Sequence, residues 1–185
     1  AGHAIVAAHC KHADPVHKIS IVPRGRAALG YTLQLPTGDQ HLFTRSELYD
    51  RIRGFLGGRA AEELVLGEVS TGAENDLQAA TQIAQSIVGR FGMGDSDRLL
   101  HCATPPYVSA TPDPNERLGF RNFSEQTAGL LDTEVEQLLR EVYEEDLRLL
   151  EKAREELERV AEALMERETL DESDFRTLLN EAPAP

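Results

Sequence analysis

The fold of this chain is decided in residues 70–92, which read STGAENDLQAATQIAQSIVGRFG. A helix that begins near Ala73 would carry an apolar stripe along one side. This stripe consists of Ala80, Ile83, Ile87 and Val88. Asp76 lies in the first turn at the edge of the stripe, although burying an unpaired carboxylate is costly. The position therefore raises the question of which positive partner Asp76 faces.

The composition is that of a soluble protein with an acidic surface. The chain has 185 residues, of which 41% are hydrophobic, enough to build the core of a single domain over residues 1–185. The formal net charge is −13 and the pI is about 4.9. Phosphate binding requires a basic surface, so we expect no nucleic-acid partner.

Two cysteines, Cys10 and Cys102, are too few for a disulfide framework. Such sparse thiols are typical of small buried side chains in a reducing compartment, which indicates the cytosol. The sequence contains no apolar run of about 18 residues and no signal-peptide pattern, so we expect the segment itself to be soluble.

Mainly α structure is expected, with a small β-sheet or hairpin near the N-terminus. Residues 1–12 read as a helix that Asp14-Pro15 ends. The alternating stretches HKISIVP at 17–23 and GYTLQLP at 30–36 predict two strands. Thr44 and Glu47 have capping-box spacing before a helix that we expect to end at Gly57-Gly58.

A second short helix is then predicted over residues 59–66, and the helix of the opening question follows, with Thr71 and Glu74 again at capping-box spacing. Residues 92–123 contain four prolines and read as a long loop. We expect residues 124–180 to form a C-terminal helical tract that starts at Ser124. Residues 1–123 form the subregion that contains the candidate site residues. We expect the acidic run at 144–146 to interrupt the tract, and Asp171 to cap its last helix.

His3 and Asp76 are the residues of chemical interest, and each has a simpler interpretation. A histidine on an apolar stripe often bonds a backbone carbonyl, and an acidic residue in a first turn is favoured by the helix dipole. A metal cluster of His9, Cys10, His12 and His17 is disfavoured, because these residues scatter around a helix and a loop.

Several glutamates are expected to face solvent rather than to do chemistry. Glu62 and Glu63 are neighbours on one helix and cannot share a face. The acidic run of Glu141, Glu144, Glu145 and Asp146 reads as the solvated side of a long helix.

Several blocks of the chain resemble the peptidase domain of the FtsH family, the membrane-anchored AAA ATP-dependent zinc metalloproteases. They occur in order from end to end and are AGHAIVAAH, HKISIVPRG, GYTLQLP, LGGRAAEELVLGE, STGAENDLQAAT, SEQTAGLLDTEVEQLL and ALMERETLD. Blocks of this length are far more specific than a lone short motif.

The resemblance implies a zinc site. In that family a helix carries His-Glu-Ala-Gly-His, in which both histidines bind Zn²⁺ and the glutamate is the general base that activates a zinc-bound water. This places the second histidine at His3 and the third protein ligand at Asp76, which answers the opening question. Glu62 matches a family position near the metal and is expected to support the site without binding the ion.

The first histidine and the catalytic glutamate of this motif fall immediately before Ala1. A protein that began at Ala1 would hold zinc poorly and would lack its general base. We therefore expect no peptidase activity from residues 1–185 alone and place no catalytic residue within them.

The resemblance also implies how the full-length protein works. It would be anchored in a membrane with this domain on the cytoplasmic side, form a homo-hexamer, and receive unfolded polypeptides from an AAA ATPase domain of the same chain, where ATP is used. An exposed edge of the sheet at 18–35 could bind the substrate as an added strand.

Two other functions compete with a zinc endopeptidase. The first is a non-catalytic helical assembly module that retains the fold, in which His3 and Asp76 serve packing or capping. The second is a metal-free His/Asp hydrolase, which is disfavoured because no nucleophile-elbow motif is present. The residues before Ala1 discriminate the enzyme from the assembly module, since only the enzyme requires His-Glu there.

Overall fold

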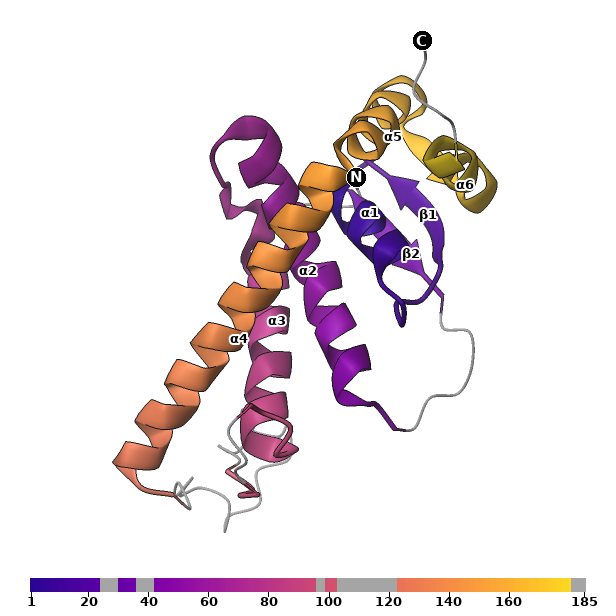
Figure 1. Cartoon of the computed structure of the whole chain (residues 1–185). Helices are drawn as coiled ribbons and strands as arrows, with labels where there is room; N and C mark the ends of the chain where they lie inside the picture. The colour runs from indigo at the N-terminus through magenta and orange to yellow at the C-terminus, as the bar shows by residue number, and fades with distance from the viewer. Residues whose placement is uncertain (24–29, 36–41, 96–98, 103–122, 181–185) are drawn as a thin grey trace.

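The computed structural model describes residues 1–23, 30–35, 42–95, 99–102 and 123–180, and it confirms a mainly α fold with a small sheet (Figure 1). The elements in chain order are α1 (Gly2–His9), β1 (Val16–Ser20), β2 (Tyr31–Gln34), α2 (Arg45–Leu66), the 3-10 turn η1 (Thr71–Ala73), α3 (Glu74–Gln85), the π-helical turn η2 (Ser86–Arg90), α4 (Glu125–Lys152), α5 (Arg154–Arg167), β3 (Thr169–Asp171) and α6 (Glu172–Asn180).

The sheet contains the two predicted strands and one that the local pattern does not reveal. Its order is β2-β1-β3 and both pairings are antiparallel, with Ile19 opposite Thr32 on one side and Leu170 on the other. β3 is only three residues long, which is too short for an alternating pattern to be recognised. In the described part of the chain, β2 is an outer strand of this sheet.

Helix α2 begins as predicted but does not end where predicted. Thr44 and Glu47 form the capping box, with the Thr44 N–H donating to Glu47 Oε2 at 2.6 Å. The helix then continues through Gly57-Gly58 to Leu66, so the expected pair of helices is wrong. Glycine lowers helix propensity by about 1 kcal/mol, but here packing against α1 offsets that cost. The helix ends at Gly67, whose φ of 73° suits glycine.

Helix α3 begins near Ala73 as predicted, and three of its four stripe residues are buried, Ile83 partly so. The turn before it is capped differently from the prediction. Ser70, not Thr71, is the N-cap residue of η1, and its side chain accepts from the Gly72 N–H. Most of the predicted loop over 92–123 lies outside the described residues.

The C-terminal tract starts at Ser124, whose hydroxyl caps α4 by accepting from the Thr127 N–H. The predicted interruption at 144–146 is wrong, because α4 runs without a break to Lys152 and the chain bends at Ala153. Asp171 caps α6 as predicted, accepting from the Asp174 N–H at 2.9 Å.

Asp146 corrects the expectation that the whole acidic run faces solvent. Glu141, Glu144 and Glu145 are exposed, but Asp146 is fully buried and its Oδ1 accepts from Arg53 Nε of α2 at 2.9 Å. A buried carboxylate requires such a partner, and the ion pair turns this position of α4 inward. The acidic run therefore does not interrupt helix α4.

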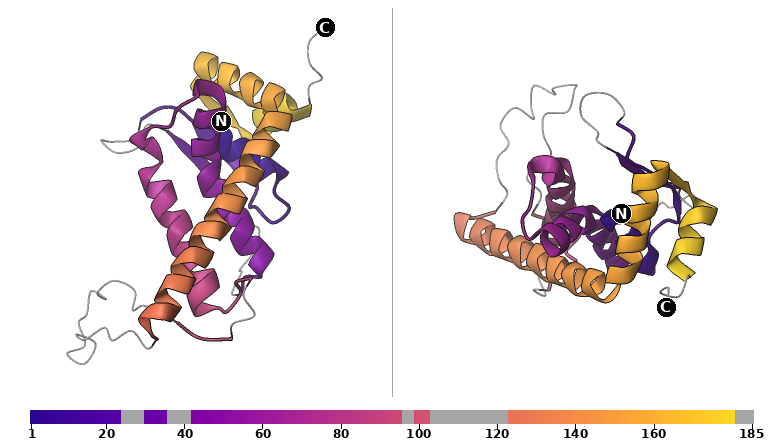
Figure 2. Two further views of the ribbon diagram at one scale, coloured as in Figure 1. Left: turned by 60° about the vertical axis from the view of Figure 1, so that its left-hand side comes forward. Right: turned by 90° about the horizontal axis from the view of Figure 1, so that it is seen from above.

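Two apolar cores hold the elements together. One joins α1, the sheet, α5 and α6 together with the C-terminal end of α4, and the other joins α2, α3 and the middle of α4. In both views of Figure 2 the long helix α4 runs along the molecule and links the two regions. Helix α1 packs against α2, which brings the N-terminal helix next to the second core.

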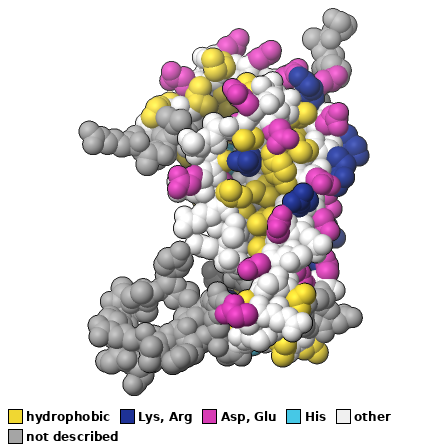
Figure 3. Space-filling view, turned by 90° about the vertical axis from the view of Figure 1, so that its left-hand side faces the viewer, with side chains coloured by type: hydrophobic (Ala, Val, Ile, Leu, Met, Phe, Trp, Pro, Cys, Tyr) yellow, Lys and Arg dark blue, Asp and Glu magenta, His cyan; other side chains and the backbone are white. Residues whose placement is uncertain are grey.

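One face of the molecule leaves apolar side chains exposed. Figure 3 shows hydrophobic side chains gathered on this face among acidic and basic ones. Elsewhere in the chain order, the end of α2, the segment after it and the first turn of α3 contain four large exposed apolar residues, namely Val65, Leu66, Val69 and Leu77. No helix in the described ranges is both long and apolar enough to cross a membrane.

Candidate metal site

His3 is held by helix α2. Its Nδ1 lies 2.8 Å from the carbonyl oxygen of Gly54, and a carbonyl can only accept, so Nδ1 carries the proton. In a neutral imidazole held this way, the other ring nitrogen, Nε2, carries the lone pair that can bind a metal. The hydrogen bond to a backbone carbonyl that the simpler interpretation of His3 expects is therefore present. The same hydrogen bond would also orient the ring of a histidine that binds a metal.

Glycines allow the imidazole to lie directly against α2. A Cβ atom at Gly58 would overlap the His3 ring, and one at Gly57 would come within 2.8 Å of Val6 Cγ2. The same close approach occurs on the other helix, because a Cβ at Gly2 would overlap the Gly57 carbonyl. Gly57 and Gly58 lower the helix propensity of α2, but their missing side chains leave the space that α1 and the His3 ring occupy.

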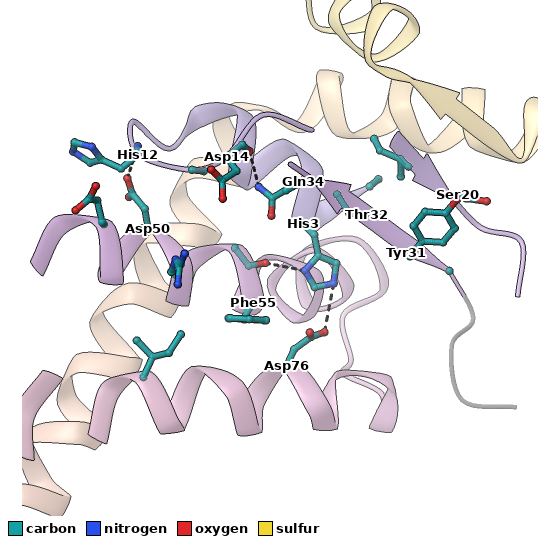
Figure 4. A pocket seen from close by; sticks show the side chains of 18 of the residues that line it. His3, His12, Asp14, Ser20, Tyr31, Thr32, Gln34, Asp50, Phe55 and Asp76 are labelled. Carbon is teal, nitrogen blue, oxygen red and sulfur yellow. Dashed lines mark hydrogen bonds and ion pairs between the residues drawn. The ribbon is translucent and has the colours of Figure 1, made fainter. Parts of the chain in front are cut away.

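Asp76 faces His3 across an open cavity (Figure 4). Asp76 Oδ2 lies 3.5 Å from His3 Nε2, although the two residues are 73 positions apart in the chain. The side chains are 32% and 36% exposed, respectively. The carboxylate therefore lies in a cavity wall rather than in the core, and solvent relieves part of the cost of burying it.

The two side chains fit a zinc ion. Ligands about 2.0–2.1 Å from a tetrahedral ion lie about 3.3 Å apart, close to the observed separation of Nε2 and Oδ2. Imidazole nitrogen and carboxylate oxygen are both zinc ligands. Among the residues that the structure describes, no third His, Cys, Asp or Glu joins the pair to form a group of three.

The cavity beside the pair has a volume of about 650 Å³ and lies between α2, α3 and the outer strand β2. Tyr31, Thr32 and Gln34 line it from β2, and Phe55 and Ile83 line it from the two helices. Figure 4 shows β2 passing next to His3. An extended chain bound along β2 would therefore pass the His3–Asp76 pair.

The Glu62 carboxylate is hydrogen-bonded to Ser70 rather than to His3 or Asp76, the two proposed metal ligands. Its carboxylate accepts from the Ser70 N–H at 2.9 Å and from the Ser70 hydroxyl at 3.0 Å. Its neighbour Glu63 turns the other way, accepting from the Tyr143 hydroxyl at 2.6 Å. Sequence analysis missed Ser70; its place three residues before the predicted helix start was the only local signal.

His9 and His17 point to partners away from His3 and Asp76, and Cys10 is buried. His9 Nε2 lies 2.8 Å from Glu156, and His17 Nδ1 lies 3.3 Å from Glu172, so these side chains point to separate partners. Cys10 is buried as predicted, and burial raises the pKa of its thiol to about 12. A thiol with this pKa is protonated at neutral pH and hence a poor ligand.

Comparison with known proteins yields one family. The model of peptidase family M41 matches residues 1–178. The ATP-dependent zinc metalloprotease FtsH 1 of Methylacidiphilum infernorum is 46% identical over 96% of this chain and 28% of its own length. The FtsH proteins of Burkholderia pseudomallei and Thermotoga maritima are 45% and 41% identical over 100% and 98% of this chain, respectively. The chain thus spans less than a third of the length of these relatives.

Proposed function

The chain belongs to peptidase family M41, and from this premise we propose that it is the zinc peptidase domain of a larger ATP-dependent protease that degrades unfolded or membrane proteins. The observation that carries the proposal is the approach of His3 Nε2 to Asp76 Oδ2 at 3.5 Å, from helices far apart in the sequence. The names of the relatives supply zinc and ATP dependence for those proteins.

Residues of this chain would hold the ion as follows. His3 would bind through Nε2, with its ring orientation set by the Gly54 carbonyl, and Asp76 would bind through its carboxylate. By resemblance, the remaining histidine and the general base would come immediately before Ala1 in the full-length protein. Bound zinc would supply a Lewis acid that polarises a water molecule and the peptide carbonyl.

The outer strand β2 supports a route for the substrate. Strand addition satisfies backbone groups and reads little side-chain sequence, which suits a protease that accepts many unfolded chains. The proposed substrate strand would lie along β2 in the cavity that His3 and Asp76 share.

Metal removal tests the peptidase proposal in the full-length protein. We expect treatment with a zinc chelator to abolish cleavage of an unfolded substrate such as casein, and added zinc to restore it. ATP hydrolysis should persist and serves as the control, because the nucleotide is used by a different domain. Cleavage that continues after elemental analysis shows the metal to be gone would overturn the proposal.

Proline substitutions test the strand-docking proposal. Neighbouring N–H groups of a strand point to opposite sides, so only one of Thr32→Pro and Leu33→Pro removes a donor from the outer edge. The other removes a donor that faces β1 and should lower the melting temperature. We expect the variant with the higher melting temperature to lose at least about fivefold in casein cleavage, since the lost ladder bond weakens docking by about 1 kcal/mol or more. Unchanged cleavage by that variant would exclude docking on this edge.

The exposed apolar residues at the end of α2 support self-association. Val65, Leu66 and Val69 are large apolar residues that are exposed close together in the chain, as at surfaces that a partner covers. By resemblance, we propose a homo-hexamer of the full-length protein, with a membrane anchor outside these residues and this domain on the cytoplasmic side. Sedimentation of the detergent-solubilised protein should give the mass of six chains, and a monomer mass would contradict the proposal.

A further inference from the structure

Helix α2 is connected to both proposed zinc ligands, to His3 directly and to Asp76 through the turn before α3. Its Gly54 carbonyl holds the His3 ring directly, as described above. Two helical turns further along, Glu62 reaches the turn that leads into α3. Since α3 carries Asp76 in its first turn, the relative placement of the two ligands depends on how firmly this turn is tied to α2.

Ser70 makes the hydrogen bonds that connect this turn to α2. Its hydroxyl donates to the Glu62 carboxylate at 3.0 Å, its N–H donates to the same carboxylate at 2.9 Å, and its Oγ accepts from the Gly72 N–H at 3.1 Å. A hydrogen bond to an ionised carboxylate is stronger than one between neutral groups. The Glu62 carboxylate thus binds both polar groups of a single residue, which orients Ser70 as a unit.

The start of α3 has no side-chain cap of its own. Its N-cap residue is Ala73, which has no side chain that could cap. The three residues of η1 pass directly into the helix, so Ser70 caps the continuous segment whose next turn contains Asp76. Packing against α2 and α4 holds the body of α3, so a displacement at Ser70 would chiefly move the first turn, which carries the Asp76 carboxylate.

We propose that Ser70, held by Glu62, is a positioning residue that sets the Asp76 carboxylate at ligand distance from His3. The inference rests on the proposed function, because positioning matters only if the pair binds an ion. Zinc tolerates errors of only about 0.2 Å in ligand distance, so a small shift of the turn is enough to weaken binding. Glu62 thus acts on the site through Ser70 rather than through the metal or its ligands.

The experiment is a zinc titration of the full-length protein with a competing chromophoric chelator. We expect Ser70→Ala and Glu62→Gln each to weaken zinc binding by about tenfold, the lower end of the range for groups that support metal ligands. Ser70→Thr keeps the hydroxyl and should retain the wild-type affinity. The double variant should bind no more weakly than the weaker single variant, since both substitutions break the same tie. Thr71→Ala, at the exposed neighbouring residue, is the matched control and should bind like wild type.

Each other result has a distinct meaning. Wild-type zinc affinity in Ser70→Ala, together with a lower melting temperature, would reduce Ser70 to a helix cap and overturn the inference. Weaker binding in Glu62→Gln but not in Ser70→Ala would show that Glu62 acts without Ser70, and would also overturn it. A wild-type protein that binds no zinc would overturn the proposed function itself, and this inference with it.

Discussion

Replacing Asp76 with alanine should remove stoichiometric zinc from the full-length protein, whereas replacing Glu74 should not. Both residues are acidic and lie in the first turn of α3, so both interact favourably with the helix dipole. Only Asp76 faces His3, with its Oδ2 at 3.5 Å from Nε2. The pair of variants therefore separates a metal ligand from an acid that serves the helix.

The expected loss for Asp76→Ala is large. Residues that merely support a ligand change metal affinity by about 10–100-fold, and removal of a ligand should exceed about 100-fold. Elemental analysis after dialysis against a weak chelator should find no zinc in Asp76→Ala and one equivalent per chain in Glu74→Ala. Peptidase activity should follow the zinc content.

Equal zinc in the two variants would exclude Asp76 as a ligand. The contact with His3 would then be an ion pair of a protonated imidazole. That outcome favours the competing function, a non-catalytic assembly module that retains the fold. With zinc removed from all the proteins, a melting temperature close to that of wild type is expected for both variants, because a dipole interaction is worth only about 0.3–1 kcal/mol.

Replacing Asp146 with alanine should lower the free energy of unfolding by about 3 kcal/mol, the lower end of the cost of breaking a buried ion pair, because Asp50 remains 3.9 Å from Arg53. The Arg53 side chain is only 18% exposed and would lose the carboxylate that its Nε contacts at 2.9 Å. This ion pair joins α2 to α4, so the loss should appear as global destabilisation. Urea denaturation of the 185-residue domain measures it.

Glu145→Ala is the matched control for this change. It removes an acidic side chain from the adjacent position of the same helix, but the side chain is exposed. Its effect on the unfolding free energy should stay within about 0.5 kcal/mol. Similar losses in the two variants would mean that the net charge of α4, rather than the buried pair, determines stability.

The same residue has a signature in the pH dependence of stability. Burial raises the pKa of Asp146 from its ordinary value of 3.8 to about 7, and its Oδ2 has no hydrogen-bond partner. At pH values between these two pKa values, Asp146 binds more protons in the folded protein than in the unfolded chain. Its contribution to the free energy of unfolding therefore declines as the pH rises from about 4 to about 7.

Asp146→Asn removes that titration. The unfolding free energy of wild type minus that of the variant should therefore fall across this interval, by at most about 1.4 kcal/mol per pH unit. Urea denaturation at several pH values from 4 to 8 tests this expectation. A difference that is constant with pH would show that Asp146 is ionised throughout.

Helix starts and strand patterns were predictable because their causes are local. The capping groups of Thr44, Ser124 and Asp171 bond residues three positions away, and the structure has all three bonds. Alternation over residues 17–23 and 30–36 predicted β1 and β2 for the same reason. The apolar stripe beside Asp76 drew attention to that residue, but only the resemblance paired it with His3 as a zinc ligand.

The errors share one physical cause, which is contact between residues far apart in the chain. Gly57-Gly58 predicted the end of a helix, but α1 packs closely against these glycines and keeps α2 continuous. Asp146 looked like part of a solvated run, yet Arg53 lies 93 positions away and pairs with it in the interior. The strand β3 forms only because β1 is there to pair with it.

The sequence by itself thus determined the mainly α class, the capped starts of three helices and the two N-terminal strands, since short-range hydrogen bonds and apolar periodicity specify these. Only the tertiary structure decided that α2 is a single helix, that Glu62 holds Ser70, and that Nε2 of His3 meets the Asp76 carboxylate. These features depend on how α1, α2 and α3 pack together, and packing is settled by the combined shape of side chains distant in the chain.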